Sequence, residues 1–472
     1  MKPTAHVFCA VLCVGSLSSP AWAMSPDPVE ARIARVEQGL STPVVVRGRS
    51  GQTMKLQDRM AFHHVPAVSI ALIDQGTIAW VRAYGATPDT RFQAASVSKT
   101  VSAVGAMALV QRGRVSLDAP ANAQLSTWKV PASALTRTSP VTLRRLLNHS
   151  AGTTVHGYDG YNREQPLPTL LETLQNVQVE AVPGTGWRYS GGGFSVVQLM
   201  VQEAAGETFE RYMQRAVLTP LGMRHSHFAV EPLADQQAHS AQGHTADGQP
   251  IAGGWRVYPE SAAAGLWTTP YDLAQVVLEI QRAAEGASGR VLSHDSARAV
   301  LTRGQGEYGL GLYVENLGQQ TSFSHSGGTA GYRAQLYGYT PGGQGVVIMT
   351  NSDNGAALID EILASVSAEY GWPEFKVIEK EAMAGDASRN RALAGRYRLL
   401  DAAAELVADG ERLHLRSDAL GGQPRELFAQ SETTFFMVDQ DMTVAVARRT
   451  DGTVSGFSLV RGANVYEATR VP

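Results

Sequence analysis

Ser96 and Lys99 are the two residues whose types and spacing suggest chemistry most directly. Residues three apart on a helix share a face, so at the start of a helix the lysine amine can reach the serine hydroxyl. The hydroxyl would also lie at the positive end of the helix dipole, beside free backbone N–H groups that could hold an oxyanion. This arrangement predicts a serine nucleophile that forms an acyl-enzyme.

The same Ser-x-x-Lys spacing occurs a second time, at Ser126 and Lys129. Asn122 and Pro131 flank this second pair, and such residues are typical of a surface loop, so we predict that the second pair has no function. A spacing found twice in one chain is too weak to assign a nucleophile alone. Assigning the nucleophile to Ser96 needs further motifs elsewhere in the chain, at plausible separations from it.

Two later segments supply these elements. The first is 189–191 (Tyr-Ser-Gly), which follows a Pro-Gly-Thr-Gly turn over 183–186 and precedes a glycine-rich start of a helix. The second is 325–328 (His-Ser-Gly-Gly), which stands ahead of strand-like residues. Paired glycines in a strand let a substrate backbone approach closely. Together the three segments favour a substrate cleft built around Ser96.

The elements that must position these segments follow from hydrophobic periodicity. Apolar residues recur at helical spacing over 96–111 and Gly113 closes the run, which predicts a buried helix that starts at the nucleophile. A hairpin is predicted over 68–82, with its turn at Gly76. The region 140–286 is predicted to be mainly helical.

Strand character returns after this helical region, so the predictions place sheet on both sides of it. The predicted strands are 308–314, 335–339 and 345–351, and the predicted helices are 31–40, 143–147, 193–205, 209–217, 271–284 and 356–370.

The first residues predict export. A basic second residue, an apolar run over 7–17 and Ala-Trp-Ala at 21–23 have the layout of a secretory signal peptide, cleaved after Ala23. The run is too short to span a bilayer, so no stable membrane anchor is expected. Cys9 and Cys13, the two cysteines of the chain, lie in this segment, so the mature protein would have no disulfide or thiol nucleophile. We predict a periplasmic or secreted location.

The composition changes again after about residue 391. Asp-Gly hairpin signals at 409–410 and 451–452 lie between runs of alternating polarity, which predicts a small antiparallel all-β domain. A charged, glycine-containing stretch before it is the predicted linker. The predicted organisation is 1–23 signal peptide, 24–378 hydrolase domain, 379–391 linker and 392–472 β domain.

Composition also limits the partners. The net charge of −3, without a long run of lysine and arginine, argues against nucleic acid. A chain of 472 residues, 44% of them hydrophobic, can bury a large core and has room for two or three domains. We expect a small-molecule or short-peptide substrate, no cofactor and no metal. The oligomeric state does not follow from the sequence.

In their order along the chain, these segments resemble the serine β-lactamase and penicillin-binding-protein superfamily. The nearest branch holds class C β-lactamases, D-aminopeptidases, DD-peptidases and related esterases. The resemblance covers roughly 65–370 and includes 146–152 (Leu-Leu-Asn-His-Ser-Ala-Gly), 220–223 (Pro-Leu-Gly-Met) and 264–272 (Ala-Gly-Leu-Trp-Thr-Thr-Pro-Tyr-Asp). It implies an α/β (α+β) fold in which a helical subdomain meets an antiparallel sheet flanked by helices. The C-terminal domain resembles the lipocalin-like appendages of some relatives.

The resemblance also implies a role for each motif residue. Ser96 would be the acylated nucleophile, and Lys99 would accept its hydroxyl proton. Tyr189 would relay a proton to the leaving group and help to activate water for deacylation. The backbone N–H groups of Ser96 and Gly328 would form the oxyanion hole, at on the order of 3 kcal/mol per donor. The substrate-binding positions would be Gly191, His325, Gly327 and Gly328.

Two departures from the family pattern bear on the substrate. Gly191 stands where an asparagine usually binds the substrate amide and steadies the lysine. His325 stands where most β-lactamases have a lysine that attracts the carboxylate of the drug, and a histidine is at most partly charged near neutral pH. Efficient β-lactam hydrolysis is therefore not expected, and histidine at this place resembles D-aminopeptidases.

The leading hypothesis is a secreted hydrolase that forms an acyl-enzyme on Ser96 and cleaves a D-residue peptide or a short ester. A β-lactamase or DD-peptidase proper is one alternative. A non-catalytic sensor or partner-binding protein of the same fold is another. Of the remaining polar residues in the motifs, His149 is predicted to be structural, and Tyr158 and Tyr161 are predicted to pack within a loop.

Overall fold

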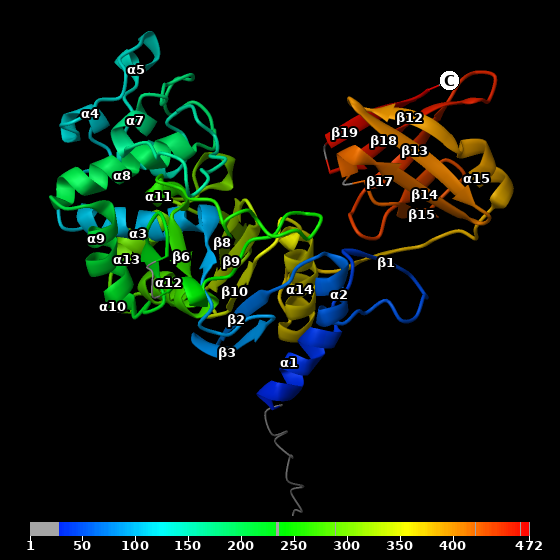
Figure 1. Cartoon of the computed structure of the whole chain (residues 1–472), viewed down its shortest axis with the longest axis horizontal. Coiled ribbons are helices and arrows are strands. Elements are labelled where there is room, and N and C mark those ends of the chain that lie inside the picture. Colours follow the sequence, from blue (N-terminus) through cyan, green and yellow to red (C-terminus); the bar gives the residue numbers. More distant parts are fainter. Residues whose placement is uncertain (1–27, 233–235, 288, 421, 463, 472) are drawn as a thin grey trace, which may run out of the picture.

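A six-stranded antiparallel sheet, helices on both of its faces and a separate closed β-barrel make up the chain (Figure 1). The computed structural model describes residues 28–471 except 233–235, 288, 421 and 463. The predicted signal peptide, 1–23, lies outside the described residues. Mixed α and β structure followed by an all-β domain confirms the predicted fold class.

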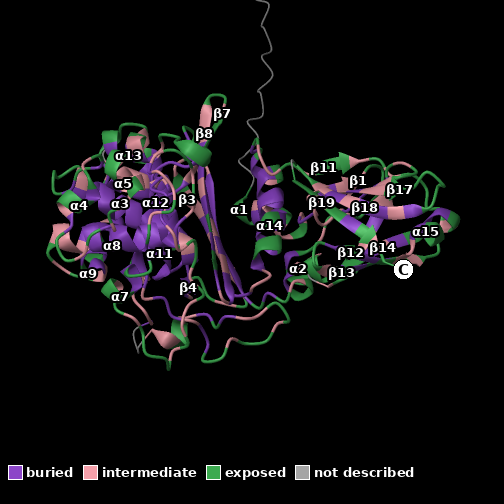
Figure 2. Ribbon diagram, turned by 90° about the horizontal axis from the view of Figure 1, so that it is seen from above, coloured by how far each residue is buried: buried purple, intermediate pink, exposed green. Residues whose placement is uncertain are grey.

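The sheet is formed by β2 (Val68–Asp74), β3 (Thr77–Tyr84), β7 (Tyr313–Leu317), β8 (Gln320–Thr329), β9 (Tyr332–Thr340) and β10 (Gly345–Thr350). Its strand order is β3–β2–β10–β9–β8–β7. Gly76, at φ +71°, makes the tight turn between β2 and β3, and the predicted hairpin is confirmed. Every residue of β10 is buried because helices cover both faces of the sheet there (Figure 2).

One predicted strand begins later than expected. The sequence predicts a strand over 308–314, but β7 begins only at Tyr313. The backbone N–H of Gly311 donates instead to the carbonyl of Leu147, at the end of a helix. Gly311 has φ +84°, a conformation that turns the chain away from the sheet. The apolar residues before Tyr313 therefore pack beside helices.

Successive residues of β10 face two different cores. Val347 and Met349 belong to the core shared with α3 (Ser98–Val110) and α12 (Pro270–Ala284). Val346 and Ile348 belong to the core shared with α14 (Gly355–Tyr370) and α1 (Val29–Gln38). Side chains alternate across a strand, so one apolar strand is buried on both sides. The sheet is the wall that separates the two cores.

The helical subdomain lies on the α12 side of the sheet (Figure 1). The helices predicted from 143 and 209 begin at those residues, and those predicted from 193 and 271 begin within two residues of the predicted start. The predicted helix 209–217 continues through a π-helical turn, η2 (Gln214–Leu218). None of the described helices has both the length and the apolar character needed to cross a membrane. The remaining helices are α2 (Leu56–Phe62), α4 (Ala121–Gln124), α5 (Ala134–Thr138), α6 (Leu143–Leu147), α7 (Leu170–Leu174), α8 (Gly191–Ala205), α9 (Phe209–Met213), α10 (Thr219–Leu221), α11 (Ser261–Ala264) and α13 (His294–Val300).

The C-terminal domain is a closed antiparallel barrel of eight strands. Both Asp-Gly signals lie at hairpin turns, where Gly410 and Gly452 have positive φ. Closure between the first and last strands leaves no open sheet edge, and an apolar interior fills the barrel. The strands are β12 (Gly395–Leu399), β13 (Ala402–Asp409), β14 (Arg412–Ser417), β15 (Arg425–Ala429), β16 (Thr434–Phe436), β17 (Thr443–Arg448), β18 (Val454–Arg461) and β19 (Asn464–Arg470).

The stretch predicted as a linker, 379–391, contains regular structure. It includes the end of β11 (Ile378–Lys380), which pairs in parallel with β1 (Val44–Val46) near the N-terminus. It also includes the start of α15 (Ala387–Leu393), whose N-terminus is capped by the Asp386 carboxylate. A connection that looks polar along the sequence is thus held by a strand partner from more than 300 residues away.

Candidate active site

The nucleophile position is set by a tight turn between a short strand and α3. β4 (Phe92–Gln93) pairs with β6 (Leu266–Thr268), and the chain then passes through the 3₁₀ turn η1 (Ala95–Val97) into the helix. Ala95 has φ +50°, which strains a residue with a side chain. Ser96 is half-buried while both its neighbours are buried. The turn therefore presents the Ser96 hydroxyl at the surface of an otherwise buried element.

The structure brings Ser96 and Lys99 together. The Lys99 Nζ lies 3.3 Å from the Ser96 Oγ and donates a hydrogen bond of 2.9 Å to the carbonyl of Ala263 on α11. Lys99 is only 2% exposed, so water does not compete for these contacts. The amine is held at the hydroxyl by a backbone carbonyl from a segment more than 160 residues away.

Tyr189 lies near the lysine. The Lys99 Nζ is 5.0 Å from the centre of the Tyr189 ring, and the side chain of Tyr189 is half-buried. Its ring also packs against the imidazole of His149, with 4.3 Å between the ring centres. Ser96, Lys99 and Tyr189 are thus neighbours, as the motif order predicts, although they come from two different helix starts.

His149 positions the second motif. The Ser190 N–H donates to its Nδ1 over 3.1 Å, and because an N–H can only donate, the ring proton is on Nε2. The imidazole is buried, and burial, followed by the nearby charge of Lys99, lowers its pKa well below the usual value. A neutral ring held in this way fixes the backbone that carries Tyr189.

His325 lies in the middle of β8, and β9 follows the motif, as the strand-like residues predicted. Its Nδ1 is 2.6 Å from the carbonyl of Ser326, and its Nε2 is 2.8 Å from the hydroxyl of Tyr308. A carbonyl only accepts, so the proton is on Nδ1 and the Tyr308 hydroxyl donates to Nε2. Burial first, and then the charge of Lys99, lowers the pKa of His325 to about 3. The third motif therefore carries no charge from His325 at neutral pH.

Between pH 5 and 8 the imidazole of His325 is expected to remain neutral. Its pKa lies below the ordinary value of 6.5, so the unfolded chain takes up a proton that the folded chain refuses. The contribution of His325 to stability is therefore present above pH 6.5 and is lost as the pH falls toward 3. Nitrogen NMR of histidine-labelled protein measures this, with His325→Gln identifying the signal. A titration midpoint between pH 5 and 8 would contradict it.

The two glycines of the third motif lie next to the nucleophile turn. A Cβ on Gly327 would come within 2.3 Å of the carbonyl oxygen of Ala94, so only glycine lets β8 approach that turn. Gly328 is exposed. β7 pairs with β8 only as far as Ser324, so within the described chain the rest of that β8 edge has no strand partner. The role of the Gly328 N–H in an oxyanion hole stays a prediction.

The comparison with protein families decides the relationship. The model of the beta-lactamase family matches residues 54–366, which contain all three motifs. The chain belongs to the beta-lactamase family. The match ends before the barrel, which begins at Gly395. The predicted resemblance to this superfamily is therefore confirmed for the catalytic part of the chain.

Individual relatives agree with the family. Penicillin-binding protein 4* of Bacillus subtilis (strain 168) is 24% identical over 411 residues, 80% of this chain and 87% of that protein. The octameric penicillin-binding protein homologue from Pyrococcus abyssi has a TM-score of 0.60 at 21% identity, covering 87% of this chain and 98% of that one. D-amino acid amidase from Ochrobactrum anthropi SV3, complexed with L-phenylalanine amide, has a TM-score of 0.52 at 21% identity, covering 67% and 97%. The two structures show a shared fold.

Gly191 departs from the family pattern because another side chain occupies the space. A Cβ added at Gly191 would lie 2.7 Å from the Cε2 atom of Tyr158. The Tyr158 hydroxyl is fixed 2.7 Å from the Ser195 Oγ on α8. Tyr158 therefore packs on the helix that carries the second motif, where the sequence predicted packing within a loop. The asparagine usual in the family has no room here.

Replacing Gly191 with asparagine is expected to lower the free energy of unfolding by about 1–3 kcal/mol, because the new side chain meets the Tyr158 ring. Combining it with Tyr158→Ala should recover part of that loss, since the space is then free. Urea unfolding of the two single variants and the double variant measures the coupling. Simple addition of the two losses would show that the introduced side chain and the Tyr158 ring do not compete for the same space.

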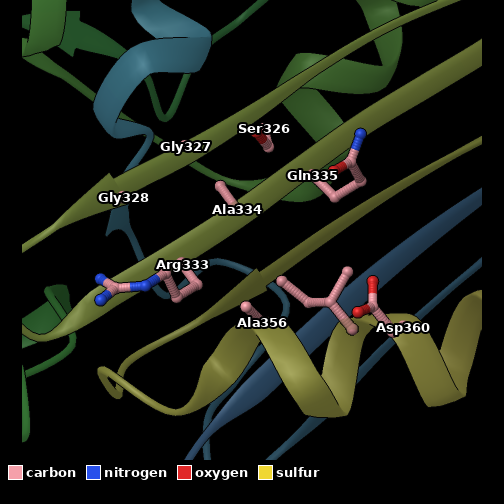
Figure 3. Close-up of a pocket in the computed structure, with 9 residues that line it drawn as sticks. Ser326, Gly327, Gly328, Arg333, Ala334, Gln335, Ala356 and Asp360 are labelled. Atoms are coloured by element: carbon pink, nitrogen blue, oxygen red, sulfur yellow. The ribbon is translucent and has the colours of Figure 1, made fainter. Parts of the chain in front are cut away.

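A cavity of about 300 Å³ opens on the other face of the third motif, against α14 (Figure 3). Arg333 lies beside Gly328 in this cavity, and its guanidinium is already paired with Asp353 at 3.1 Å and with two backbone carbonyls. Arg333 therefore places a positive charge next to the third motif, but its guanidinium is already bound by Asp353 and the two carbonyls. The lining residues are Ser326, Gly327, Gly328, Arg333, Ala334, Gln335, Ala356, Ile359 and Asp360.

The second Ser-x-x-Lys pair lies in an exposed turn, as predicted. The Ser126 Oγ donates to Glu203 over 2.7 Å, and the Lys129 Nζ donates to the carbonyl of Asn122 over 2.7 Å. The serine and the lysine therefore have other partners. Sequence reasoning missed Tyr308, because its hydroxyl meets His325 of the third motif only through the fold.

Proposed function

We propose that this member of the beta-lactamase family is an exported hydrolase that forms an acyl-enzyme on Ser96 and cleaves an amide or ester. Its proposed substrates are small peptides with a D-residue or short esters. The observation that carries the proposal is the buried Lys99 amine, 3.3 Å from the Ser96 hydroxyl and held by the Ala263 carbonyl. A buried lysine aimed at a serine is the arrangement that activates a weak nucleophile.

The proposed reaction has two steps. In acylation the Ser96 Oγ attacks the substrate carbonyl while its proton passes to the Lys99 amine, and the backbone N–H groups of Ser96 and Gly328 hold the oxyanion. The C–N or C–O bond then breaks, and the amine or alcohol leaves with a proton relayed through Tyr189. In deacylation water attacks the Ser96 ester, a carboxylic acid leaves, and the proton returns to Ser96.

The charge of the third motif supports substrates other than β-lactams. His325 is neutral and donates its only ring proton to the Ser326 carbonyl, so it offers no positive charge to a substrate carboxylate. Arg333 is held by Asp353. Without a free cation at this place, a substrate gains nothing from a carboxylate beside its scissile bond. The fold shared with a D-amino acid amidase agrees with a D-residue amide.

Export is proposed from the sequence. Residues 1–23 have the layout of a signal peptide, and residues 24–472 contain no cysteine, which suits an oxidising compartment. We propose a periplasmic or secreted enzyme that meets small molecules or short peptides.

Intact-mass spectrometry of residues 24–472 tests the function. The protein is mixed with p-nitrophenyl butyrate, with a D-alanyl peptide or with benzylpenicillin, and quenched at intervals. We expect a transient adduct on Ser96 with the ester or the peptide, and a penicilloyl adduct that is hydrolysed only slowly to the ring-opened acid. Rapid penicillin turnover would favour a β-lactamase, and an adduct that is never released would favour a sensor. No adduct on Ser96 with any of them would refute the hydrolase.

A further inference from the structure

The cavity beside the third motif lies between the sheet and the first turns of α14 (Figure 3). The three residues 326–328 of β8 line it from the sheet, and Ala356 and Asp360 line it from the helix. Its volume of about 300 Å³ is at the lower end of the range for small-molecule sites. A substrate group of several non-hydrogen atoms therefore fits next to the third motif.

One strand, β8, lies between this cavity and the nucleophile turn. A Cβ added to Gly327 would come within 2.3 Å of the carbonyl oxygen of Ala94, so the strand touches the turn that presents Ser96. β7 pairs with β8 no further than Ser324, and beyond that residue this edge of β8 has no strand partner within the described chain. A substrate bound at Ser96 can therefore reach the cavity around an open strand edge.

Gly328 keeps this route open. A Cβ added there would lie 3.5 Å from the Cδ atom of Arg333, which also lines the cavity. The space that a side chain would fill is thus on the cavity side of the strand. Because Gly328 has none, the third motif leaves a passage from the strand edge into the cavity.

The cavity lies at the end of the site from which the leaving group departs. In the proposed reaction Tyr189 passes a proton to that group. The Tyr189 ring centre is 6.3 Å from that of His325, and the next residue, Ser326, lines the cavity. The oxyanion is placed two residues further along β8, at Gly328. A group that leaves on the Tyr189 side is therefore directed toward Ser326 and the cavity.

The polar groups of the cavity are mainly acceptors. Asp360 forms no hydrogen bond or ion pair with any described residue. The side-chain amide nitrogen of Gln335 donates to the Leu336 carbonyl over 3.0 Å, which leaves its oxygen able to accept. Arg333 is already bound by Asp353 and by two backbone carbonyls. Oxygen acceptors beside a spent cation attract an ammonium group and repel a carboxylate.

The surroundings of Asp360 also favour a positive partner. Partial burial raises the pKa of Asp360 above its ordinary value of 3.8, because its ionised form loses water. The charge of Arg461, the last residue of β18, acts in the opposite direction, but the two described side chains form no ion pair. An ammonium group that donates to the carboxylate would replace the lost water.

We propose that this cavity binds the leaving group of the substrate, and that Asp360 and Gln335 select a leaving amine that carries a second, positively charged amine. The inference rests on the proposed function and names its substrate class: amides of a D-residue with a diamine or with a lysine-like residue, in preference to neutral or acidic ones. The step is the acylation described above. The C–N bond breaks, and the departing diamine takes the proton that Ser96 gave up.

Two amides of D-alanine test the charge preference. One has 1,5-diaminopentane as the leaving amine, and the other has pentylamine, which has the same carbon chain but no second amine. The second amine is charged at pH 8, as a lysine amine is. We expect the wild type to prefer the diamine by at least about tenfold in kcat/KM, and Asp360→Asn to lower this preference to below about threefold, mainly through KM. Mass spectrometry measures both products.

The conservative variant sharpens this test. Asp360→Glu keeps the charge and should retain part of the preference for the diamine. An unchanged preference in Asp360→Asn, or no preference in the wild type, would overturn the proposal.

D-alanine methyl ester is the reference substrate. Its leaving group, methanol, is too small to extend into the cavity. Its kcat/KM should therefore agree with that of the wild type to within about twofold in Asp360→Asn. An equal loss on the methyl ester and on the diamine amide would show that Asp360 is structural, and the proposal would fall.

Asp58→Asn is the matched control for charge. Asp58 is exposed on α2, a helix bound to α14 through Arg59 and Glu361, and it does not line the cavity. This variant removes the same charge from the neighbouring helix and should retain the wild-type preference. If it lost the preference as Asp360→Asn does, the effect would be a general one of surface charge.

Filling the cavity tests whether the leaving group enters it. Ala356 is exposed and lines the cavity, so Ala356→Leu adds bulk there without a buried clash. It should lower kcat/KM at least about fivefold for both amides and leave the methyl ester unchanged. Ala357→Leu is the control, because Ala357 is exposed on the same helix but does not line the cavity. Equal rates on the amides in the two variants would refute the subsite.

Binding without turnover separates this proposal from the proposed function. Calorimetry with the diamine amide is carried out on Ser96→Ala and on Ser96→Ala combined with Asp360→Asn. We expect at least about fivefold weaker binding in the double variant, and equal binding would refute the subsite. In the wild type, turnover of both amides without a preference removes only the subsite. No turnover of any of the three substrates, with the binding difference intact, removes only the hydrolase.

Discussion

Replacing Ser96 with alanine is expected to lower kcat for release of p-nitrophenol from p-nitrophenyl butyrate by about 10⁴-fold or more. The alanine has no oxygen to attack the ester, so no acyl-enzyme forms. The lysine and the oxyanion donors remain, and they leave only the residual rate that binding and polarisation supply. Stopped-flow absorbance should show the loss of both the initial burst and the steady rate.

Ser126→Ala is the matched control for this experiment. Ser126 has the same spacing to a lysine, but it lies in an exposed turn and donates to Glu203. Its burst and turnover should equal those of the wild type. If Ser96→Ala kept its turnover, the nucleophile would lie elsewhere. Loss of activity in Ser126→Ala instead would assign the nucleophile to the second Ser-x-x-Lys pair.

Replacing Lys99 with methionine should lower the acylation rate by about 10²- to 10⁴-fold, the usual contribution of a positioned general base. Methionine has a similar length and suits the buried position, so the main change is loss of the amine beside the Ser96 hydroxyl. The Ala263 carbonyl loses its donor, which should cost about 1–3 kcal/mol of stability. Burst kinetics measure acylation, and urea unfolding measures the stability.

Lys129→Met serves as the control, because this exposed lysine donates to the Asn122 carbonyl and lies away from Ser96. It should leave the burst unchanged. A second test is pH: with Lys99→Met the remaining acylation should rise with hydroxide concentration, since the base is then supplied by solvent. An unaltered burst in Lys99→Met would remove the lysine from the mechanism.

Two interactions in the site accompany its departures from the family pattern. His325 is kept neutral by burial and is held by Tyr308, so the third motif does not attract a carboxylate. Tyr158 takes the space of the usual asparagine beside Gly191.

Much of the fold could be predicted because its signals are local. Gly76 marks the hairpin of β2 and β3, and the two Asp-Gly turns mark the barrel. The late start of β7 could not be predicted, because the N–H of Gly311 donates to the end of a distant helix. The strand pairing of β11 with β1 joins residues that lie far apart in the chain, and no local pattern announces it.

The candidate site, too, was predicted in part from the sequence and decided in part by the tertiary structure. The sequence by itself determined the serine and lysine, because residues three apart at a helix start must share a face, and the motif order then pointed to the family. Only the tertiary structure decided that His325 is neutral. Protonation and hydrogen bonding depend on burial and on charges that arrive from other segments, such as Lys99 beside His325. Those neighbours exist only once the chain has folded.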